Sequence, residues 1–283
     1  MTRGGTITNY FTVDVEDYFQ VSAFERLADP QHWDRFECRV ERNTGVILGL
    51  LEKHGISGTF FITGWIAERH PRLVQEITGA GHEIACHSYW HRKVYDLSPK
   101  EFREDTLRAK NILEDIVGAP ICGYRAPSYS VTARSLWALD ILAEMGFTYD
   151  SSIFPIHHDL YGMPGAPRFA YRLEKQGIHE YPPTTLKLGR YCLPIAGGGY
   201  FRLFPYWFSE WALGSINTRE HKPFMFYVHP WEIDPQQPRM KSAGLKSRFR
   251  HYNNLEKTES RLDRLLHRFR FGPIAHHSTA LDD

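Results

Sequence analysis

Cysteine is scarce in this chain, which has four cysteines among 283 residues. No two of them form a Cys-x-x-Cys pair, so the sequence argues against a thiolate zinc site and weakly favours a reducing compartment. We interpret all four as core residues: Cys38, Cys86, Cys122 and Cys192.

The chain also lacks long apolar runs and a strong net charge. No stretch approaches the roughly 18 consecutive apolar residues of a membrane-spanning helix, and the start, residues 1–6, has no apolar signal region. The formal net charge is +1, with acidic and basic residues mixed, and only residues 239–270 are locally basic, which we interpret as a solvated helix face. These absences predict a cytoplasmic protein that binds no nucleic acid and inserts stably into no membrane.

What the chain does have is a regular alternation of short apolar segments with amphipathic ones, which predicts an α/β fold with a parallel sheet. At 283 residues and 42% hydrophobic content, it is expected to form one catalytic domain, 1–283. We expect strands at 7–13, 58–62, 83–86, 121–124, around 149, and 223–228. We expect helices at 45–53, 71–78, 99–117 and 132–145.

Two further stretches give local structural signals: the ends of one helix and a long insertion. Ser98, Pro99 and Glu101 are typical of a capped helix start, and Gly118 is typical of a helix end. Residues 153–206, rich in proline, glycine and aromatics, predict a long loop and hairpin insertion that shapes a substrate cleft.

His87 and His91 are the most informative residues, because a four-residue spacing on one helical turn can direct two imidazoles at one metal ion. The acidic cluster Asp14, Glu16 and Asp17 follows an apolar strand and supplies a carboxylate ligand. Two histidines and one carboxylate leave coordination positions open for water, which hydrolytic metal sites require.

Three more polar residues follow expected strands. Arg125 could keep a catalytic carboxylate ionised through a bidentate pair, and His229 has a side chain suited to protonating a leaving group near neutral pH. Asp150 follows the strand between them and is a candidate for orienting His229. The carboxyl ends of parallel strands meet at one edge of a sheet, so we expect one site there.

In this order, the segments resemble the motifs of the polysaccharide deacetylase family, the NodB-homology carbohydrate esterases, over about residues 7–231. The resemblance implies a distorted parallel (β/α) barrel of about seven strands, with a long insertion and a C-terminal helix in the extension 232–283. It assigns the catalytic base to Asp14, metal binding to His87 and His91, the third motif to Arg125, oxyanion binding to the backbone near Tyr129, the fourth motif to Asp150, and the general acid to His229.

The first motif departs from the commonest family pattern, in which two aspartates are adjacent, because Val15 follows Asp14. Alternate residues of a strand share one face, so Glu16 is assigned to the metal, with Asp17 as a rival ligand. The wider string around Asp14, the run that follows His229 and a basic C-terminal helix resemble a subfamily associated with bacterial exopolysaccharide gene clusters.

The implied activity is removal of N-acetyl groups from amino sugars of a polysaccharide or its precursor. The implied cofactor is one divalent metal ion, zinc first, with cobalt, nickel or manganese as alternatives. Tyr89, Trp90 and Trp231 adjoin the expected site and are candidates for stacking on a sugar. Alternative functions are a deformylase or cyclic-amide hydrolase on the same barrel, or a non-catalytic sugar-binding protein; the oligomeric state stays open.

Overall fold

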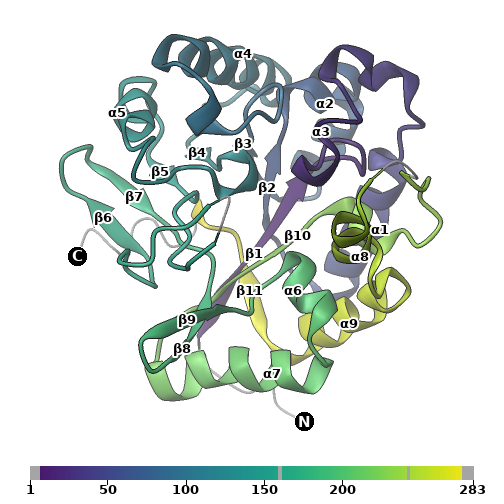
Figure 1. Ribbon diagram of the computed structural model, residues 1–283, viewed down its shortest axis with the longest axis vertical. Helices are drawn as coiled ribbons and strands as arrows, with labels where there is room; N and C mark the ends of the chain where they lie inside the picture. The colour runs from purple at the N-terminus through teal and green to yellow at the C-terminus, as the bar shows by residue number, and fades with distance from the viewer. Residues whose placement is uncertain (1–6, 159–160, 241–242, 276–283) are drawn as a thin grey trace.

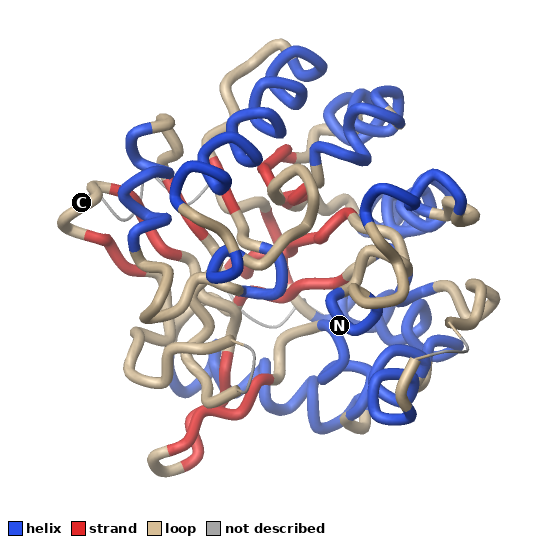
Figure 2. Tube along the Cα trace, turned by 45° about the horizontal axis from the view of Figure 1, so that its top comes forward, coloured by secondary structure: helices blue, strands red, loops and turns tan. Residues whose placement is uncertain are grey.

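The computed structural model describes residues 7–158, 161–240 and 243–275, and shows a mostly parallel, curled sheet with helices around it (Figure 1). The strands lie together with helices around the outside (Figure 2). The predicted distorted parallel barrel is therefore confirmed as a curled sheet, and the C-terminal helix is present. None of the described helices combines the length and the apolar character needed to cross a membrane.

Among the described residues the main sheet has nine strands, in the order β10-β1-β2-β3-β4-β5-β7-β6, with β11 also pairing with β1. Only the β6–β7 pairing is antiparallel there. The strands are β1 Thr8–Val15, β2 Thr59–Ile62, β3 Glu83–Cys86, β4 Gly123–Tyr124, β5 Tyr149–Asp150, β6 Tyr171–Leu173, β7 Ile178–Glu180, β10 Met225–Val228 and β11 Arg270–Gly272. A separate hairpin joins β8 Thr185–Leu188 to β9 Tyr191–Pro194.

The helices are α1 Val40–His54, α2 Gly64–Arg69, α3 Pro71–Gly79, α4 Pro99–Val117, α5 Trp137–Glu144, α6 Gly198–Leu203, α7 Tyr206–Ser215, α8 Leu245–Tyr252 and α9 Leu255–Arg268. Helix α4 has the predicted bounds: Ser98 and Glu101 form a capping box, and Gly118 adopts the left-handed conformation that ends the helix. Helix α1 begins at Val40, earlier than predicted, because the Asp17 carboxylate accepts from the backbone N–H groups at its start.

The described part of the segment 153–206 contains two antiparallel strand pairs, in agreement with the predicted loop and hairpin insertion, and one of its strands also joins the main sheet. Strand β7 pairs in parallel with β5, so the insertion extends the main sheet. The C-terminal region also joins the sheet, because β10 and β11 both pair with β1. The interpretation of the cysteines as core residues holds only for Cys86; Cys38 and Cys122 are exposed, because they lie outside the strands and helices.

Register places the expected site at one edge of the sheet. Val15 pairs with Ile62, Cys86 with Tyr124, and Tyr124 with Asp150. The strand ends therefore stand side by side, and the polar residues that follow each strand are brought to the same edge.

Candidate active site

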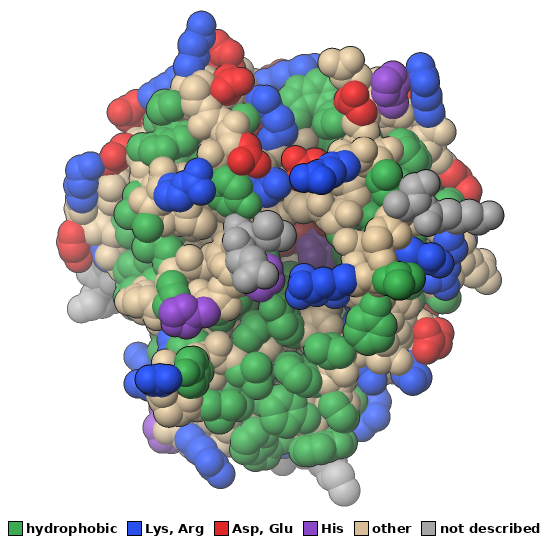
Figure 3. Space-filling model, in the orientation of Figure 1, with side chains coloured by type: hydrophobic (Ala, Val, Ile, Leu, Met, Phe, Trp, Pro, Cys, Tyr) green, Lys and Arg blue, Asp and Glu red, His purple; other side chains and the backbone are tan. Residues whose placement is uncertain are grey.

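A pocket of about 160 Å³ lies at this edge of the sheet. Figure 3 shows a hollow near the centre of this face, with histidine at its floor. The pocket is lined by Asp14, Glu16, Val21, Ser22, His87, His91, Ser128, Tyr129, Tyr161, Tyr227, His229 and Trp231. Residues from five separate regions of the chain therefore meet in one cavity.

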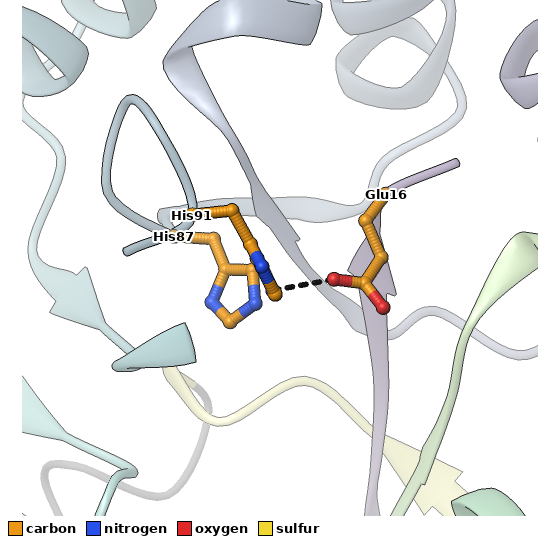
Figure 4. Close-up of side chains that lie close together, drawn as sticks. All are labelled: Glu16, His87 and His91. Atoms are coloured by element: carbon orange, nitrogen blue, oxygen red, sulfur yellow. Dashed lines mark ion pairs between the residues drawn. The ribbon is translucent and has the colours of Figure 1, made fainter. Parts of the chain in front are cut away.

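Glu16, His87 and His91 form a compact group inside this pocket (Figure 4). One potential ligand atom from each residue lies within 4.8 Å of the others, and all three side chains are buried. Oε2 of Glu16 is 2.5 Å from Nε2 of His91. Two imidazole nitrogens and one carboxylate oxygen are a ligand set of catalytic zinc sites, so the donor chemistry fits a divalent metal.

The imidazole of His87 is held in one tautomer. Its Nδ1–H donates to the backbone carbonyl of Arg125 at 2.7 Å, and since a carbonyl can only accept, the lone pair must be on Nε2. Burial lowers the pKa of His87 to about 4, which keeps the ring neutral. A backbone acceptor behind a neutral imidazole is the usual support of a metal-ligating histidine.

The two histidines do not lie on a helical turn as predicted. Residues 87–91 form an irregular loop in which Ser88 and His91 adopt positive φ values of 61° and 52°. Asp105 of α4 holds this loop, because its carboxylate accepts from the backbone N–H of Tyr89 at 2.7 Å and of Trp90 at 3.2 Å. Sequence analysis did not identify Asp105; its signal was an acid on the apolar face of a predicted helix.

Glu16 and Asp17 have different environments. Glu16 follows the end of β1 and points into the pocket with Asp14. The carboxylate of Asp17 instead accepts from the backbone N–H groups of Arg39 and Val40, at 2.6 and 3.0 Å. It thereby caps the start of α1, which explains the early start of that helix. The structure groups Glu16, and not Asp17, with the histidines.

Asp14 and Arg125 form a buried ion pair. Nη1 of Arg125 donates to Oδ1 of Asp14 at 2.5 Å, and both side chains are almost fully buried. The predicted bidentate pair is not formed, because the guanidinium also donates to the hydroxyls of Thr12 and Ser151, both at 2.9 Å. Arg125 therefore fixes the direction of the Asp14 carboxylate while its other oxygen, Oδ2, faces His229.

His229 is oriented by Glu232. Nδ1 of His229 lies 2.7 Å from Oε1 of Glu232, whose Oε2 accepts from Nε of Arg202 at 2.6 Å. Nε2 of His229 is directed into the pocket, 3.8 Å from Oδ2 of Asp14 and 3.6 Å from Oε1 of Glu16. Burial lowers the pKa of His229, but the carboxylates of Glu16, Glu232 and Asp14 outweigh it and raise the pKa to about 9.

The predicted role of Asp150 as the partner of His229 is wrong. Its carboxylate instead accepts from the hydroxyl of Ser152 at 2.5 Å and lies beside Glu180 of β7, because β5 ends on the opposite side of β4 from the metal-site strands. The signal for Glu232 was local: a proline and an acid follow His229 in the pattern of a capped turn.

The aromatic candidates divide into two groups. Trp231 lines the pocket, and its Nε1–H donates to Oε1 of Glu16 at 3.1 Å. Tyr89 and Trp90 do not line it, because Tyr89 donates to Glu68 at 2.6 Å and packs edge-to-face against Trp90. Their predicted contact with substrate is therefore wrong.

Tyr129 lines the pocket, but its own backbone N–H is already bonded, so oxyanion binding by the neighbouring backbone stays a prediction. The backbone N–H of Tyr129 donates to the carbonyl of Ala126 at 3.0 Å and is not free to bind an oxyanion. Its buried hydroxyl accepts and donates no hydrogen bond among the described residues. The Tyr129 side chain, rather than its backbone, is therefore the polar group available to a ligand.

Comparisons with known proteins agree with this geometry. Residues 32–149 match the family model described as polysaccharide deacetylase, and residues 151–278 match a domain of unknown function, DUF3473. A peptidoglycan-N-acetylglucosamine deacetylase from Bacillus cereus is 31% identical over 98 residues, which are 34% of this chain and 36% of that protein. The chain thus spans about a third of the length of the curated relatives it matches.

Solved structures share the fold. A Mycobacterium smegmatis protein assigned as a polysaccharide deacetylase superposes with a TM-score of 0.65 at 20% identity, covering 100% of this chain and 92% of that chain. A CE4 family pseudoenzyme from Bacillus anthracis superposes with a TM-score of 0.51 at 14% identity, covering 100% and 67%. At these identities the likeness concerns the fold alone, and the chemistry must be argued from the pocket.

Proposed function

This chain belongs, through residues 32–149, to the polysaccharide deacetylase family, and from that premise we propose that it is a metal-dependent hydrolase of N-acetylated amino sugars. The observation that carries the proposal is that a carboxylate base, a histidine acid and a Glu-His-His donor set line one pocket. Metal-assisted hydrolysis of an amide combines these three functions within reach of one carbonyl group.

Glu16, His87 and His91 would hold the metal. A divalent ion at such a site polarises the amide carbonyl and makes water acidic enough to act as a nucleophile near neutral pH. The chain supports two of these ligands separately, through the Arg125 carbonyl behind His87 and the Trp231 indole on Glu16. We propose zinc as the ion, with cobalt, nickel and manganese as alternatives that metal analysis distinguishes.

Asp14 is the proposed general base. Its Oδ1 is engaged by Arg125, so the attacking water loses its proton to Oδ2, which faces the pocket. The buried guanidinium fixes the direction of the carboxylate. The new C–O bond forms at the acetyl carbon, and the carbonyl oxygen gains negative charge.

His229 is the proposed general acid. Its Nε2 faces the same space as Asp14 Oδ2, and Nδ1 is held by Glu232. It donates a proton to the nitrogen as the C–N bond breaks, so the products are acetate and a free amine. The Tyr129 hydroxyl, which has no partner among the described residues and belongs to a residue that lines the pocket, would donate to the oxygen that becomes negative.

We further propose that the substrate belongs to exopolysaccharide synthesis, as a polymer or its precursor. This rests on the resemblance of the first motif and of the run after His229, and not on the pocket. The fold is also shared by a pseudoenzyme, so catalysis itself must be tested.

The test is release of acetate from N-acetylglucosamine oligosaccharides by the purified protein. Activity is measured after chelation and after return of each metal, with metal content determined in parallel. We expect chelation to abolish acetate release and one metal to restore it. Asp14→Asn is expected to retain the metal and lose release. Formate release, or opening of a cyclic amide, would identify one of the alternative hydrolases; saccharide binding without turnover by the metal-loaded protein would identify a binding protein.

A further inference from the structure

A second, larger cavity adjoins the active-site pocket. Its volume is about 300 Å³, and Tyr161 and Tyr227 line both cavities. Its other walls come from α6 and α8, which lie in the segment matched by the domain of unknown function. The second cavity is lined by His158, Tyr161, Gly199, Tyr200, Leu203, Tyr227, Lys246, Phe249, Arg250 and Asn253.

Among the described residues that line this cavity, the formal charges of the Lys, Arg, Asp and Glu side chains are of one sign. Lys246 and Arg250 are four residues apart on α8, so they project from the same face of the helix, and both line the cavity. No Asp or Glu lines it, and neither cation forms an ion pair with a carboxylate within the described part of the chain. In another surface cavity, by contrast, two of the cations are paired, Lys53 with Asp263 and Arg268 with Glu210, and both carboxylates line that cavity.

The cationic wall is fixed in place by the interior. The buried guanidinium of Arg202 on α6 donates to the backbone carbonyls of Arg250 at 3.0 Å and of His251 at 2.8 Å. The same guanidinium holds Glu232, which orients His229. Helix α8 is therefore tied to the acid side of the active site.

The remaining lining is mainly aromatic and apolar, with Asn253 and His158 as further polar groups. Tyr200 contributes an aromatic ring, and the Tyr161 ring is stacked on His158 with ring centroids 3.9 Å apart, while Phe249 and Leu203 are 60% and 49% exposed at the rim. Figure 3 shows hydrophobic side chains gathered below the central hollow, over α6 and α7. Aromatic rings can pack against a sugar ring, and neighbouring cations can bind an anionic group that the sugar carries.

We propose that this second cavity binds an anionic group of the substrate next to the N-acetylated sugar in the active site. The inference rests on the proposed function for the neighbouring site. Two substrates provide this chemistry: a polymer with an acidic sugar beside the acetylated one, and a sugar joined through a diphosphate to a lipid carrier. In both, Lys246 and Arg250 would pair with the anion.

The test compares three N-acetylated substrates. The first is a neutral N-acetylglucosamine oligosaccharide, the second is an oligosaccharide of equal length with a glucuronic acid beside the acetylated sugar, and the third is N-acetylglucosamine diphosphate on a short polyprenyl chain. The variant is Lys246→Gln with Arg250→Gln. The matched control is Arg248→Gln, on the same helix but outside the cavity lining.

We expect the double variant to lower kcat/KM about tenfold for at least one anionic substrate, mainly through KM, because two exposed charge pairs together are worth about that factor. The neutral substrate and the Arg248→Gln control should change less than about twofold. A loss limited to the glucuronic acid substrate identifies an acidic polymer, and a loss limited to the diphosphate identifies a carrier-linked precursor. Equal losses on all three substrates, or none, overturn the proposal.

Direct binding separates this proposal from the proposed function. Calorimetry with all three compounds on the Asp14→Asn protein, with and without Lys246→Gln and Arg250→Gln, measures affinity without turnover. If no substrate releases acetate but the double variant still loses affinity only for the anions, the hydrolase assignment fails and the second cavity stands. If the wild-type protein releases acetate but the double variant leaves the affinity of the Asp14→Asn protein for both anions unchanged, the second cavity fails alone.

Discussion

Nδ1 of His229 lies 2.7 Å from Oε1 of Glu232, and this contact determines which nitrogen of the imidazole faces the pocket. Because a carboxylate only accepts, Nδ1 carries a proton and Nε2 is the atom directed at the substrate. Glu232 is in turn bound to Arg202, so the proposed acid is held by a buried chain of charged groups.

Glu232 is therefore expected to act through His229. Glu232→Gln should lower kcat by about tenfold or more, with metal content unchanged, because the imidazole loses its charged partner. A double-mutant cycle provides the check: the pair Glu232→Gln with His229→Ala should be no slower than His229→Ala alone. Glu259→Gln, at an exposed position of α9, is the control. Additive losses would mean that Glu232 does not work through His229.

The effect of replacing His229 is expected to depend on the leaving group of the substrate. His229→Ala should keep the fold and the metal but lower turnover on N-acetylated sugars by roughly 10² to 10⁴. The phenolate of an aryl ester and the nitroaniline of a nitroacetanilide leave with little need for a proton. The loss of turnover in His229→Ala should therefore be smaller on these substrates. Kinetics on both substrate classes, with metal analysis, measure this. An equal deficit on both, or loss of the metal, would rule out a proton donor.

Glu16 and Asp17 are adjacent, and the structure assigns them opposite consequences. Glu16→Ala should remove most of the bound metal, because one of the three grouped ligand atoms is lost. Asp17→Ala should retain the metal and lower the free energy of unfolding by about 1–3 kcal/mol, since the N–H groups of Arg39 and Val40 lose their acceptor. Metal content and denaturant unfolding decide between them, and the reverse pattern would make Asp17 the ligand.

Asp105 is expected to matter for the metal without touching it. Asp105→Ala leaves the N–H groups of Tyr89 and Trp90 without their acceptor, so the loop between His87 and His91 should lose its fixed shape. Metal affinity should fall about 10- to 100-fold, as for other groups that support ligands. Asp115→Ala, at an exposed position of the same helix, serves as the comparison. Unchanged affinity in both variants would show that the loop holds itself.

The buried carboxyl group of Glu180 is expected to make the free energy of unfolding depend on pH. Burial and the neighbouring Asp150 raise the pKa of Glu180 well above its ordinary value, so the folded protein keeps a proton that the unfolded chain releases above its ordinary pKa. The unfolded state then binds fewer protons, and the free energy of unfolding falls as pH rises above the ordinary pKa of a glutamate, by up to about 1.4 kcal/mol per pH unit.

Glu180→Gln, which mimics the protonated acid, should flatten this decline. Urea unfolding at several pH values between about 5 and 8 measures it. Glu174→Gln, whose native side chain is 85% exposed, should leave the slope unchanged. A wild-type slope equal to that of Glu180→Gln would show that Glu180 is ionised in the fold.

The sequence by itself determined the fold class, the bounds of α4 and the edge of the sheet at which the site lies. These depend on local patterns: apolar strands ending on polar residues, and a capping box followed by a glycine. The period of a strand also favoured Glu16 over Asp17, because alternate residues share one face. The cytoplasmic location stays a prediction.

Only the tertiary structure decided which partner each charged group takes. Asp17 caps a helix that begins more than 20 residues later, and Arg202 reaches Glu232 across 30 residues. The loop of His87 and His91 is set by Asp105 on another element, not by helical spacing. Hydrogen bonds form between groups that are close in space. When such groups are far apart in the sequence, the local periodicity of the sequence cannot predict that they pair.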